Sequence, residues 1–155
     1  MAGERLSRGD LLLLVAVLAV FGIAVSGYLA WQWYASESAS WCDLSSYLNC
    51  TKVRDSPWAA VAGIPTAFVG VGGFGILLAF AMLALRGTER IGQWSVDGGL
   101  LAFAIVGALT GLGLTFVEIF VIQAICILCV IGFALDLGIL GIAWTLSGSV
   151  RTSPA

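Results

Sequence analysis

Long apolar stretches dominate this sequence and leave few folds open to it. Four of them, over about residues 11–33, 64–85, 98–117 and 123–146, are separated by short polar segments. About 20 apolar residues in a helix cross the ~30 Å hydrocarbon core of a bilayer, and a helix satisfies its own backbone hydrogen bonds in lipid. With 60% hydrophobic and 10% charged residues, a soluble domain is not expected. The sequence predicts an all-α membrane protein, a four-transmembrane-helix bundle that forms a single integral-membrane domain over residues 1–155.

Polar and helix-breaking residues set the boundaries of these spans. Residues 98–146 are too long for one span and fit two. The turn between the two belongs at the polar interruption 118–123, where we expect Glu118 to be an interfacial anchor. Gly63-Ile64-Pro65 opens the second span, with proline in the first helical turn, where its missing N–H costs little. The loop 34–63 before it is polar and carries two cysteines.

Arginine and lysine positions predict how the spans cross the membrane. Four spans place both termini and the 88–97 connection on one side and the loop 34–63 on the other. The two sides carry five and two basic residues: Arg5, Arg8, Arg86, Arg90 and Arg151 against Lys52 and Arg54. By the positive-inside rule, a multi-pass protein of the cell membrane results, with cytoplasmic termini and an exoplasmic loop. The first span resembles a signal peptide, but its length and the lack of an Ala-x-Ala site predict that it is retained.

Four cysteines suggest the chemistry of the chain. Cys42 and Cys50 lie in the polar loop, which we expect to be mobile, so they can pair with each other or meet another partner. Cys126 and Cys129 lie in the last span, where a helical spacing of three brings Cβ atoms to about 5–6 Å. All four then share the exoplasmic half, where disulfides persist. Thiol–disulfide exchange can carry electrons from an external dithiol protein to the loop pair, to the buried pair and to a lipid-soluble acceptor.

Other interpretations of these cysteines stay open. A cysteine in a membrane helix often serves as a small hydrophobe, and a zinc site would have to close its tetrahedron partly within the bilayer. We expect no metal, because the chain has no histidine, the commonest metal ligand. The chain has no basic patch of the kind that binds nucleic acid, so we expect no nucleic-acid partner. A helix N-terminus favours a thiolate at Cys126 whereas apolar surroundings disfavour it, so the balance is open.

Glycines recur within the spans and allow helices to approach closely. We interpret six of them as packing residues: Gly70, Gly72, Gly73, Gly75, Gly107 and Gly111.

A combination of motifs resembles the vitamin K epoxide reductase family. Over about residues 11–146, the motifs are Cys42-Asp43, Cys50, Ser56-x-Trp58, Gly63-Ile64-Pro65 and Cys126-x-x-Cys129. The resemblance implies a four-helix bundle around a quinone of the ubiquinone or menaquinone type, capped by the loop. It also implies that Cys42 exchanges with a thioredoxin-like protein, that Cys50 passes electrons to Cys126, and that Cys129 lies beside the quinone ring. Ser56 is at the family's active-site loop serine, and Trp58 either anchors the cap or is an interfacial tryptophan.

The chain departs from the family pattern in two places. Four residues after Cys129, animal vitamin K enzymes carry a tyrosine that hydrogen-bonds the quinone, and here the residue is Phe133. A polar contact to a quinone must come from elsewhere, which argues against vitamin K epoxide as substrate. Many microbial members carry a fused thioredoxin-like domain after a fifth helix. Because this sequence stops at Ala155, we expect the dithiol partner to be a separate protein.

Asp136 is a second candidate for a functional role within the bilayer. It lies seven residues beyond Cys129, about 10 Å deeper along a helix, and an ionisable residue there is a functional hypothesis by default. It serves either as a proton relay to the quinone or as a neutral carboxyl hydrogen-bonded across the bundle. We predict a quinone-dependent membrane thiol oxidoreductase. A vitamin K epoxide or quinone-recycling reductase is the alternative, and a small transporter or structural subunit with incidental cysteines is the rival of a different class.

Overall fold

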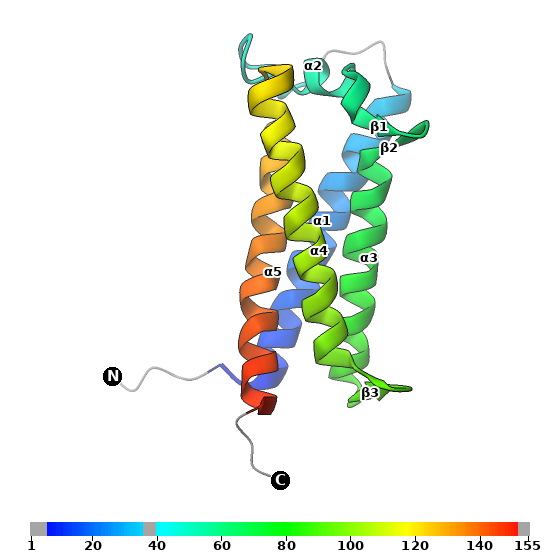
Figure 1. Ribbon diagram of the computed structural model, residues 1–155, viewed down its shortest axis with the longest axis vertical. Coiled ribbons are helices and arrows are strands. Elements are labelled where there is room, and N and C mark those ends of the chain that lie inside the picture. Colours follow the sequence, from blue (N-terminus) through cyan, green and yellow to red (C-terminus); the bar gives the residue numbers. More distant parts are fainter. Residues whose placement is uncertain (1–5, 36–39, 152–155) are drawn as a thin grey trace, which may run out of the picture.

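Four long helices form a bundle in the computed structural model, which describes residues 6–35 and 40–151 (Figure 1). They are α1 (Arg8–Tyr34), α3 (Thr66–Leu85), α4 (Val96–Val117) and α5 (Ile127–Arg151). Helix α1 packs against α3 and α5, and α4 packs against the same two helices, which closes the ring. The predicted fold class is confirmed. Of the basic residues used to predict orientation, Arg5 and the side chain of Arg151 lie outside the described part of the chain.

The helices begin where side chains or strands supply their first hydrogen bonds. Helix α1 starts at Arg8, three residues earlier than expected, because Ser7 and Asp10 form a capping box. Helix α4 starts at Val96, where the Ser95 hydroxyl accepts a hydrogen bond from the Gly98 amide. The expectation that Pro65 lies in the first turn of a helix is wrong. Strand β2 (Ile64–Pro65) pairs with β1 (Ala60–Val61), so Pro65 precedes α3.

The connection between α4 and α5 also differs from the expected simple turn at 118–123. Helix α4 continues into a π-helical turn, η2 (Glu118–Ile122), which ends at Gln123 in the left-handed conformation (φ 55°). A residue in that conformation cannot continue a right-handed helix, so the chain leaves the axis and α5 begins only at Ile127. Cys126 therefore precedes the helix instead of lying within it.

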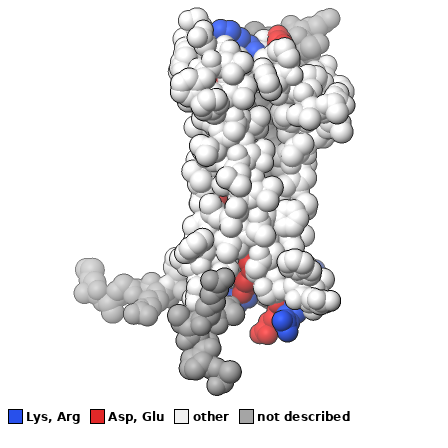
Figure 2. Space-filling model, in the orientation of Figure 1, with Lys and Arg blue, Asp and Glu red and all other residues white. Residues whose placement is uncertain are grey.

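The surface of the bundle has the pattern of a membrane protein. Lys, Arg, Asp and Glu gather at the two ends, and the long band between them is almost free of charge (Figure 2). Large apolar side chains such as Phe21, Leu109 and Phe116 are more than half exposed in that band. All four long helices are long and apolar enough to span a bilayer. The chain is thus a multi-pass membrane protein.

The two ends of the bundle have different structures. The loop end carries the short helix α2 (Cys50–Arg54), the 3-10 turn η1 (Pro57–Ala59) and the hairpin β1–β2. The opposite end carries the hairpin of β3 (Arg90–Ile91) and β4 (Trp94–Ser95). Below the centre, an apolar core that includes Leu12, Leu100 and Ile139 joins the helices. The loop end has no comparable core of aliphatic side chains among the described residues, and it is there that the cysteines lie.

Only some of the membrane glycines pack against a neighbouring helix. A Cβ added at Gly70, Gly107 or Gly111 would collide with Ser26, Asp136 or Phe133 respectively. These three positions fit the packing interpretation. At Gly72, Gly73 and Gly75, an added Cβ would meet no atom within 4 Å. The interpretation as packing residues is therefore wrong for those three.

Candidate redox site

Backbone pairing between the loop and the segment before α5 brings two cysteines together. The Ile125 amide donates a hydrogen bond to the Tyr47 carbonyl at 2.7 Å, and the Asn49 amide donates to the Ile125 carbonyl at 3.1 Å. Cys50 follows Asn49 in the chain, and Cys126 follows Ile125. The Sγ atoms of Cys50 and Cys126 lie 3.2 Å apart as a result.

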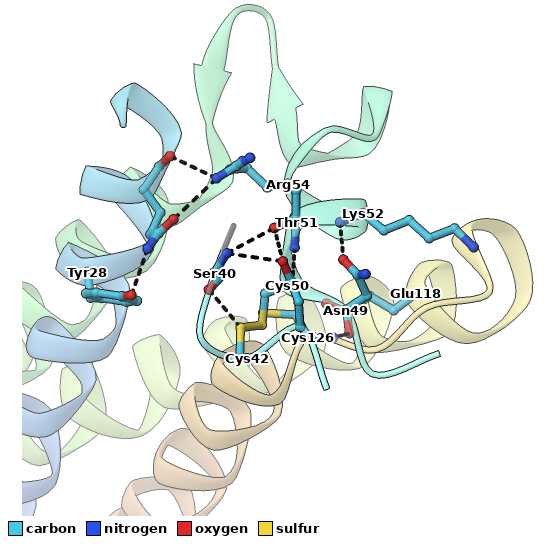
Figure 3. Close-up of a disulfide and its surroundings, with 12 residues drawn as sticks. Tyr28, Ser40, Cys42, Asn49, Cys50, Thr51, Lys52, Arg54, Glu118 and Cys126 are labelled. Carbon is cyan, nitrogen blue, oxygen red and sulfur yellow. Dashed lines mark hydrogen bonds between the residues drawn. A yellow bond between two sulfur atoms is a disulfide. The ribbon is translucent and has the colours of Figure 1, made fainter. Parts of the chain in front are cut away.

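All four cysteines meet at the loop end of the bundle. Cys42 and Cys50 form a disulfide (Figure 3). Cys126 and Cys129 are thiols. The first three are at most 4% exposed, and Cys129 packs against them. Exchange proceeds by attack of a thiolate on a disulfide sulfur. The contact between Cys50 and Cys126 therefore permits exchange between the loop pair and the helix pair.

Asp43 holds the loop in the conformation that joins Cys42 to Cys50. Its carboxylate accepts hydrogen bonds from the Thr51 amide at 3.0 Å, the Ser40 amide at 3.1 Å and the Thr51 hydroxyl (Figure 3). Burial alone would raise the pKa of Asp43, but these hydrogen bonds outweigh it and hold the pKa below its usual value. The carboxylate also lies at the start of α2, where the helix dipole favours a negative charge.

The loop disulfide is buried, although it lies in a loop of polar composition. Cys42 is 0% exposed. Its Sγ lies 3.1 Å from the hydroxyl of Ser40, which is itself buried. A protein partner can reach Cys42 only if the loop moves aside. The same hydroxyl is placed to donate a hydrogen bond to a Cys42 thiolate once the disulfide is broken.

Glu118 is buried beside the helix pair, so the expectation of an interfacial anchor is wrong. It is 4% exposed, and its Oε2 accepts a hydrogen bond from the Cys126 amide at 3.2 Å. The Cys129 thiol lies close to both the Glu118 carboxyl and Cys126 Sγ. Its interaction with Cys126 lowers the pKa of Cys126, although burial and the Glu118 charge oppose the effect. The π-helical turn that directs Glu118 inward could not be read from hydropathy.

A cavity of about 630 Å³ extends from the cysteines into the bundle. Cys50, Cys126 and Cys129 line it at one end, Phe133 and Asp136 line it further along α5, and most of its remaining lining is apolar. Pockets that bind small molecules have volumes of roughly 300–1,000 Å³ and apolar walls with a few polar groups. The cavity thus has the size and chemistry of a site for an apolar molecule next to two thiols.

Asp136 is the acidic residue of this cavity. It is 5% exposed, and its Oδ2 has no hydrogen-bond partner within the described residues. The carboxyl lies against Gly107, where an added Cβ would approach Oδ1 to 2.7 Å. The structure therefore does not show the cross-bundle hydrogen bond that a purely structural role would use for Oδ2.

Comparison with known protein families matches residues 13–144 to the Vitamin K epoxide reductase family. The match covers most of the chain and includes all four cysteines. The chain belongs to the vitamin K epoxide reductase family. It is therefore a membrane thiol oxidoreductase. Within the described residues, no group of three or more His, Cys, Asp or Glu side chains could hold a metal ion.

Two residues that the family resemblance suggested lie apart from the cavity. The Ser56 hydroxyl donates a hydrogen bond to the Val53 carbonyl at 2.7 Å, and Trp58 is 53% exposed. Neither residue is among those that line the cavity in the described structure, whereas Ala59 is. Ser56 and Trp58 belong to the loop whose next residue, Ala59, lines the cavity, and their role in quinone binding stays a prediction.

Arg54 is a cavity residue that sequence reasoning used only as a charge. Its Nη1 donates to the backbone carbonyl and the side-chain Oε1 of Gln32, both at 3.3 Å, and Gln32 donates to the Tyr28 hydroxyl at 2.7 Å (Figure 3). These bonds fix α2, and with it Cys50, to α1. No spacing in the sequence pairs Gln32, near the end of α1, with Arg54, the last residue of α2.

Proposed function

We propose that the protein oxidises the dithiol of a separate thioredoxin-like protein and passes the electrons to a membrane quinone. The observation that carries this proposal is the continuous path of sulfur atoms from the loop to the cavity. The Cys42–Cys50 disulfide leads to Cys126 through a 3.2 Å contact, and Cys129 lines the cavity beyond it.

The transfer from the partner consists of exchange steps that conserve electrons. A partner thiolate bonds to Cys42, and the electron pair of the broken disulfide goes to Cys50. The Cys50 thiolate attacks Cys126 of an oxidised Cys126–Cys129 pair, and the electron pair of that bond goes to Cys129. The second partner thiol then displaces Cys42, which attacks Cys50 and releases Cys126. The products are an oxidised partner, the loop disulfide and two helix thiols, the state that the structure has.

The cavity fits a quinone head group and gives it access from lipid. A bound quinone supplies an acceptor of two electrons and two protons. Val69 of α3 and Val106 of α4 line the cavity, and both are more than half exposed. We infer that an apolar molecule enters the cavity from the bilayer between α3 and α4.

Asp136 has the position of a proton relay to the acceptor. Its unpartnered Oδ2 is buried in the wall of the cavity that also contains Cys129. An isolated carboxylate is costly in such surroundings, so the neutral acid, which can donate a hydrogen bond, is the form expected there. Phe133 has no hydroxyl, so Asp136 takes the place of a polar contact that a tyrosine would make.

The proposed reaction also requires a particular orientation in the membrane. The loop end faces the exoplasmic side, and the end with β3 and β4 faces the cytoplasm, in keeping with Arg86 and Arg90 at that end. Dithiol substrates that need oxidation are found on the exoplasmic side, since disulfides persist there.

Quinone reduction by the purified protein tests this proposal. The donor is a reduced thioredoxin-like protein or a small dithiol, and wild type is compared with Cys129→Ala and Cys42→Ala. We expect Cys129→Ala to abolish turnover with either donor. Cys42→Ala should block the protein donor and retain activity with the small dithiol, which can reduce the helix pair directly. Wild-type turnover in both variants would show that the cysteines are packing residues.

Two further measurements separate the rival functions. Vitamin K epoxide offered in place of the quinone should not be reduced, because Phe133 cannot supply a hydroxyl; turnover equal to that of the quinone would favour the recycling reductase. Replacement of all four cysteines should remove the activity of the protein in cells. A transporter or structural subunit with incidental cysteines would keep its function after that replacement.

A further inference from the structure

Glu118 is a buried carboxyl that the exchange steps above do not use. It is 4% exposed, and neither of the salt bridges within the described residues includes it. A buried carboxylate without a cation is costly, and an ionisable residue within a membrane span is a functional hypothesis by default. The only acidic residues between positions 98 and 146 are Glu118 and Asp136. Asp136 lines the redox cavity, and Glu118 contacts Cys126, which also lines it.

The local backbone aims this carboxyl at the helix thiols. The π-helical turn η2 begins at Glu118, and such turns are frequent at functional sites because they redirect side chains. Both the Gln123 and Ala124 amides donate to the Glu118 carbonyl, which closes the turn. The side chain then accepts a hydrogen bond from the Cys126 amide and lies close to the Cys129 thiol (Figure 3 shows Glu118 with Cys126).

Oxidation of the helix pair must dispose of two protons. It forms one bond between Cys126 Sγ and Cys129 Sγ and releases two electrons and two protons, which together convert a quinone to a quinol. Cys126 loses its proton first, since the hydrogen bond from Cys129 lowers the pKa of Cys126. The remaining proton is on Cys129, within reach of two acceptors, the Cys126 sulfur and the Glu118 carboxylate. Once Cys126 bonds to Cys129, the Cys126 sulfur no longer accepts that proton, and the Glu118 carboxylate is the basic side chain close to it.

We propose that Glu118 is the general base that takes the Cys129 proton when the Cys126–Cys129 pair is oxidised, an inference that rests on the proposed function. The proton leaves Cys129 Sγ for a Glu118 oxygen, while the electron pair stays on sulfur for transfer to the acceptor. Glu118 then returns the proton to the cavity, where the reduced acceptor takes it up. Glu118 and Asp136 thus serve the two ends of one reaction, the first at the thiol and the second at the acceptor.

Among the described residues, the elements with the most contacts to η2 offer no other base for this proton. Cys126, just before α5, and Cys129 of α5 face Glu118, and α4 and α2 pack against η2. The charged residues of α2 are Lys52 and Arg54, which are cations at neutral pH and cannot accept a proton. The backbone carbonyls nearby are far too weakly basic.

The test compares Glu118→Gln with wild type and with Glu89→Gln, which makes the same change on an exposed residue at the opposite end. Glutamine keeps an oxygen for the Cys126 amide but cannot take a proton. A general base contributes about 10²–10⁴-fold. We therefore expect E118Q to slow oxidation of the reduced helix pair by a quinone at least about 100-fold at pH 7, with a rate that recovers in proportion to hydroxide concentration. E89Q should behave as wild type.

Alkylation of Cys126 provides a readout that does not depend on turnover. The Glu118 charge raises the pKa of Cys126, so its removal should leave Cys126 at least as reactive toward a small maleimide, measured by mass spectrometry. Slow oxidation with unimpaired alkylation supports a general base. A parallel loss of both rates would show that Glu118 only positions Cys126, and unchanged oxidation would overturn the proposal. If E118Q fails to fold, Glu118→Asp provides a second variant that keeps a carboxylate. Its helix pair should be oxidised at a rate that does not depend on hydroxide concentration. A hydroxide-dependent rate in E118D would also overturn the proposal.

The same comparison with a small disulfide as oxidant separates this inference from the proposed function. Closure of the Cys126–Cys129 bond by a small disulfide also requires loss of the Cys129 proton. If wild type fails to reduce any quinone but E118Q still slows closure with the small disulfide, the quinone proposal falls and the role of Glu118 stands. If wild type reduces quinone and E118Q forms the Cys126–Cys129 bond at the wild-type rate with both oxidants, the quinone proposal stands and the role of Glu118 falls.

Discussion

A trapped disulfide between Cys50 and Cys126 provides the sharpest test of the site geometry. The double variant Cys42→Ala/Cys129→Ala keeps only these two cysteines, whose Sγ atoms lie 3.2 Å apart. We expect it to form an intramolecular disulfide under mild oxidation. Disulfides stabilise mainly through the entropy of the closed loop, and the sequence separation here is 76 residues. The chain-entropy relation gives roughly 4.5 kcal/mol for such a loop and roughly 2.5 kcal/mol for the separation of eight between Cys42 and Cys50.

These free energies convert into a measurable change in thermal stability. For a domain of this size, 1 kcal/mol corresponds to roughly 2–4 °C in Tm. The oxidised double variant should therefore unfold up to about 9–18 °C above its reduced form, an upper bound because the unfolded state keeps residual structure. Scanning fluorimetry of the tryptophans measures Tm, and mass spectrometry of blocked thiols measures the yield of the disulfide.

A matched pair of cysteines supplies the control for this trap. Cys42→Ala/Cys126→Ala keeps Cys50 and Cys129, and no hydrogen bond joins these two sulfur atoms in the described structure, whereas one joins Cys50 and Cys126. It should form an intramolecular disulfide at least about tenfold more slowly, since thiol–disulfide reactions depend on access to the attacked sulfur. Equal rates for the two variants, or a lack of any Cys50–Cys126 disulfide, would refute the placement of the loop on η2 and α5.

Three other predictions address the cavity and the loop. Asp136→Asn should slow quinone reduction at least about tenfold through loss of proton transfer, and unchanged turnover would remove the relay role. Gly73→Leu should raise the KM for quinone because Gly73 lines the cavity. Gly75 is on the same helix but outside that lining, so Gly75→Leu should leave the KM unchanged. Equal effects of the two substitutions in a turnover assay would contradict the cavity assignment. Because hydrogen bonds lower the pKa of Asp43, loop order should persist at neutral pH. The order of the loop should be lost only as the pH falls below the ordinary aspartate pKa of about 3.9. Hydrogen exchange of residues 40–54 should then rise in wild type. Asp43→Asn should lack this pH-dependent rise.

Hydropathy and residue spacing predicted the parts of this structure that depend on local sequence. The four spans follow from apolar runs that match the bilayer, and the two cysteine pairs follow from their positions at one end of those runs. The family resemblance supplied the order in which the cysteines act, which the structure accommodates through the contact between Cys50 and Cys126. No local pattern predicts that contact, because it depends on pairing between residues 47–49 and residue 125.

The incorrect expectations have a common physical cause. Pro65, Cys126 and Glu118 were assigned from their distance to a span boundary, as if helices simply ended where polarity rose. In the structure, a strand pair displaces Pro65 from the helix, and a left-handed Gln123 displaces Cys126. The π-helical turn rotates Glu118 from the interface into the protein. Each of these is a tertiary or backbone effect that a scale of residue polarity does not contain.

The burial of Cys42 places two opposing demands on the loop. Transfer from Cys50 to Cys126 needs the closed loop, since their contact depends on the pairing with Ile125. Attack by a protein partner needs an open loop, since Cys42 is 0% exposed. The hydrogen bonds of Asp43 favour the closed form, in which the disulfide is protected from adventitious thiols. In the proposed function, a partner that binds the open loop would supply the free energy of opening from its own contacts. The loop disulfide would thereby be shielded from small reductants and still accept electrons from the protein that opens the loop.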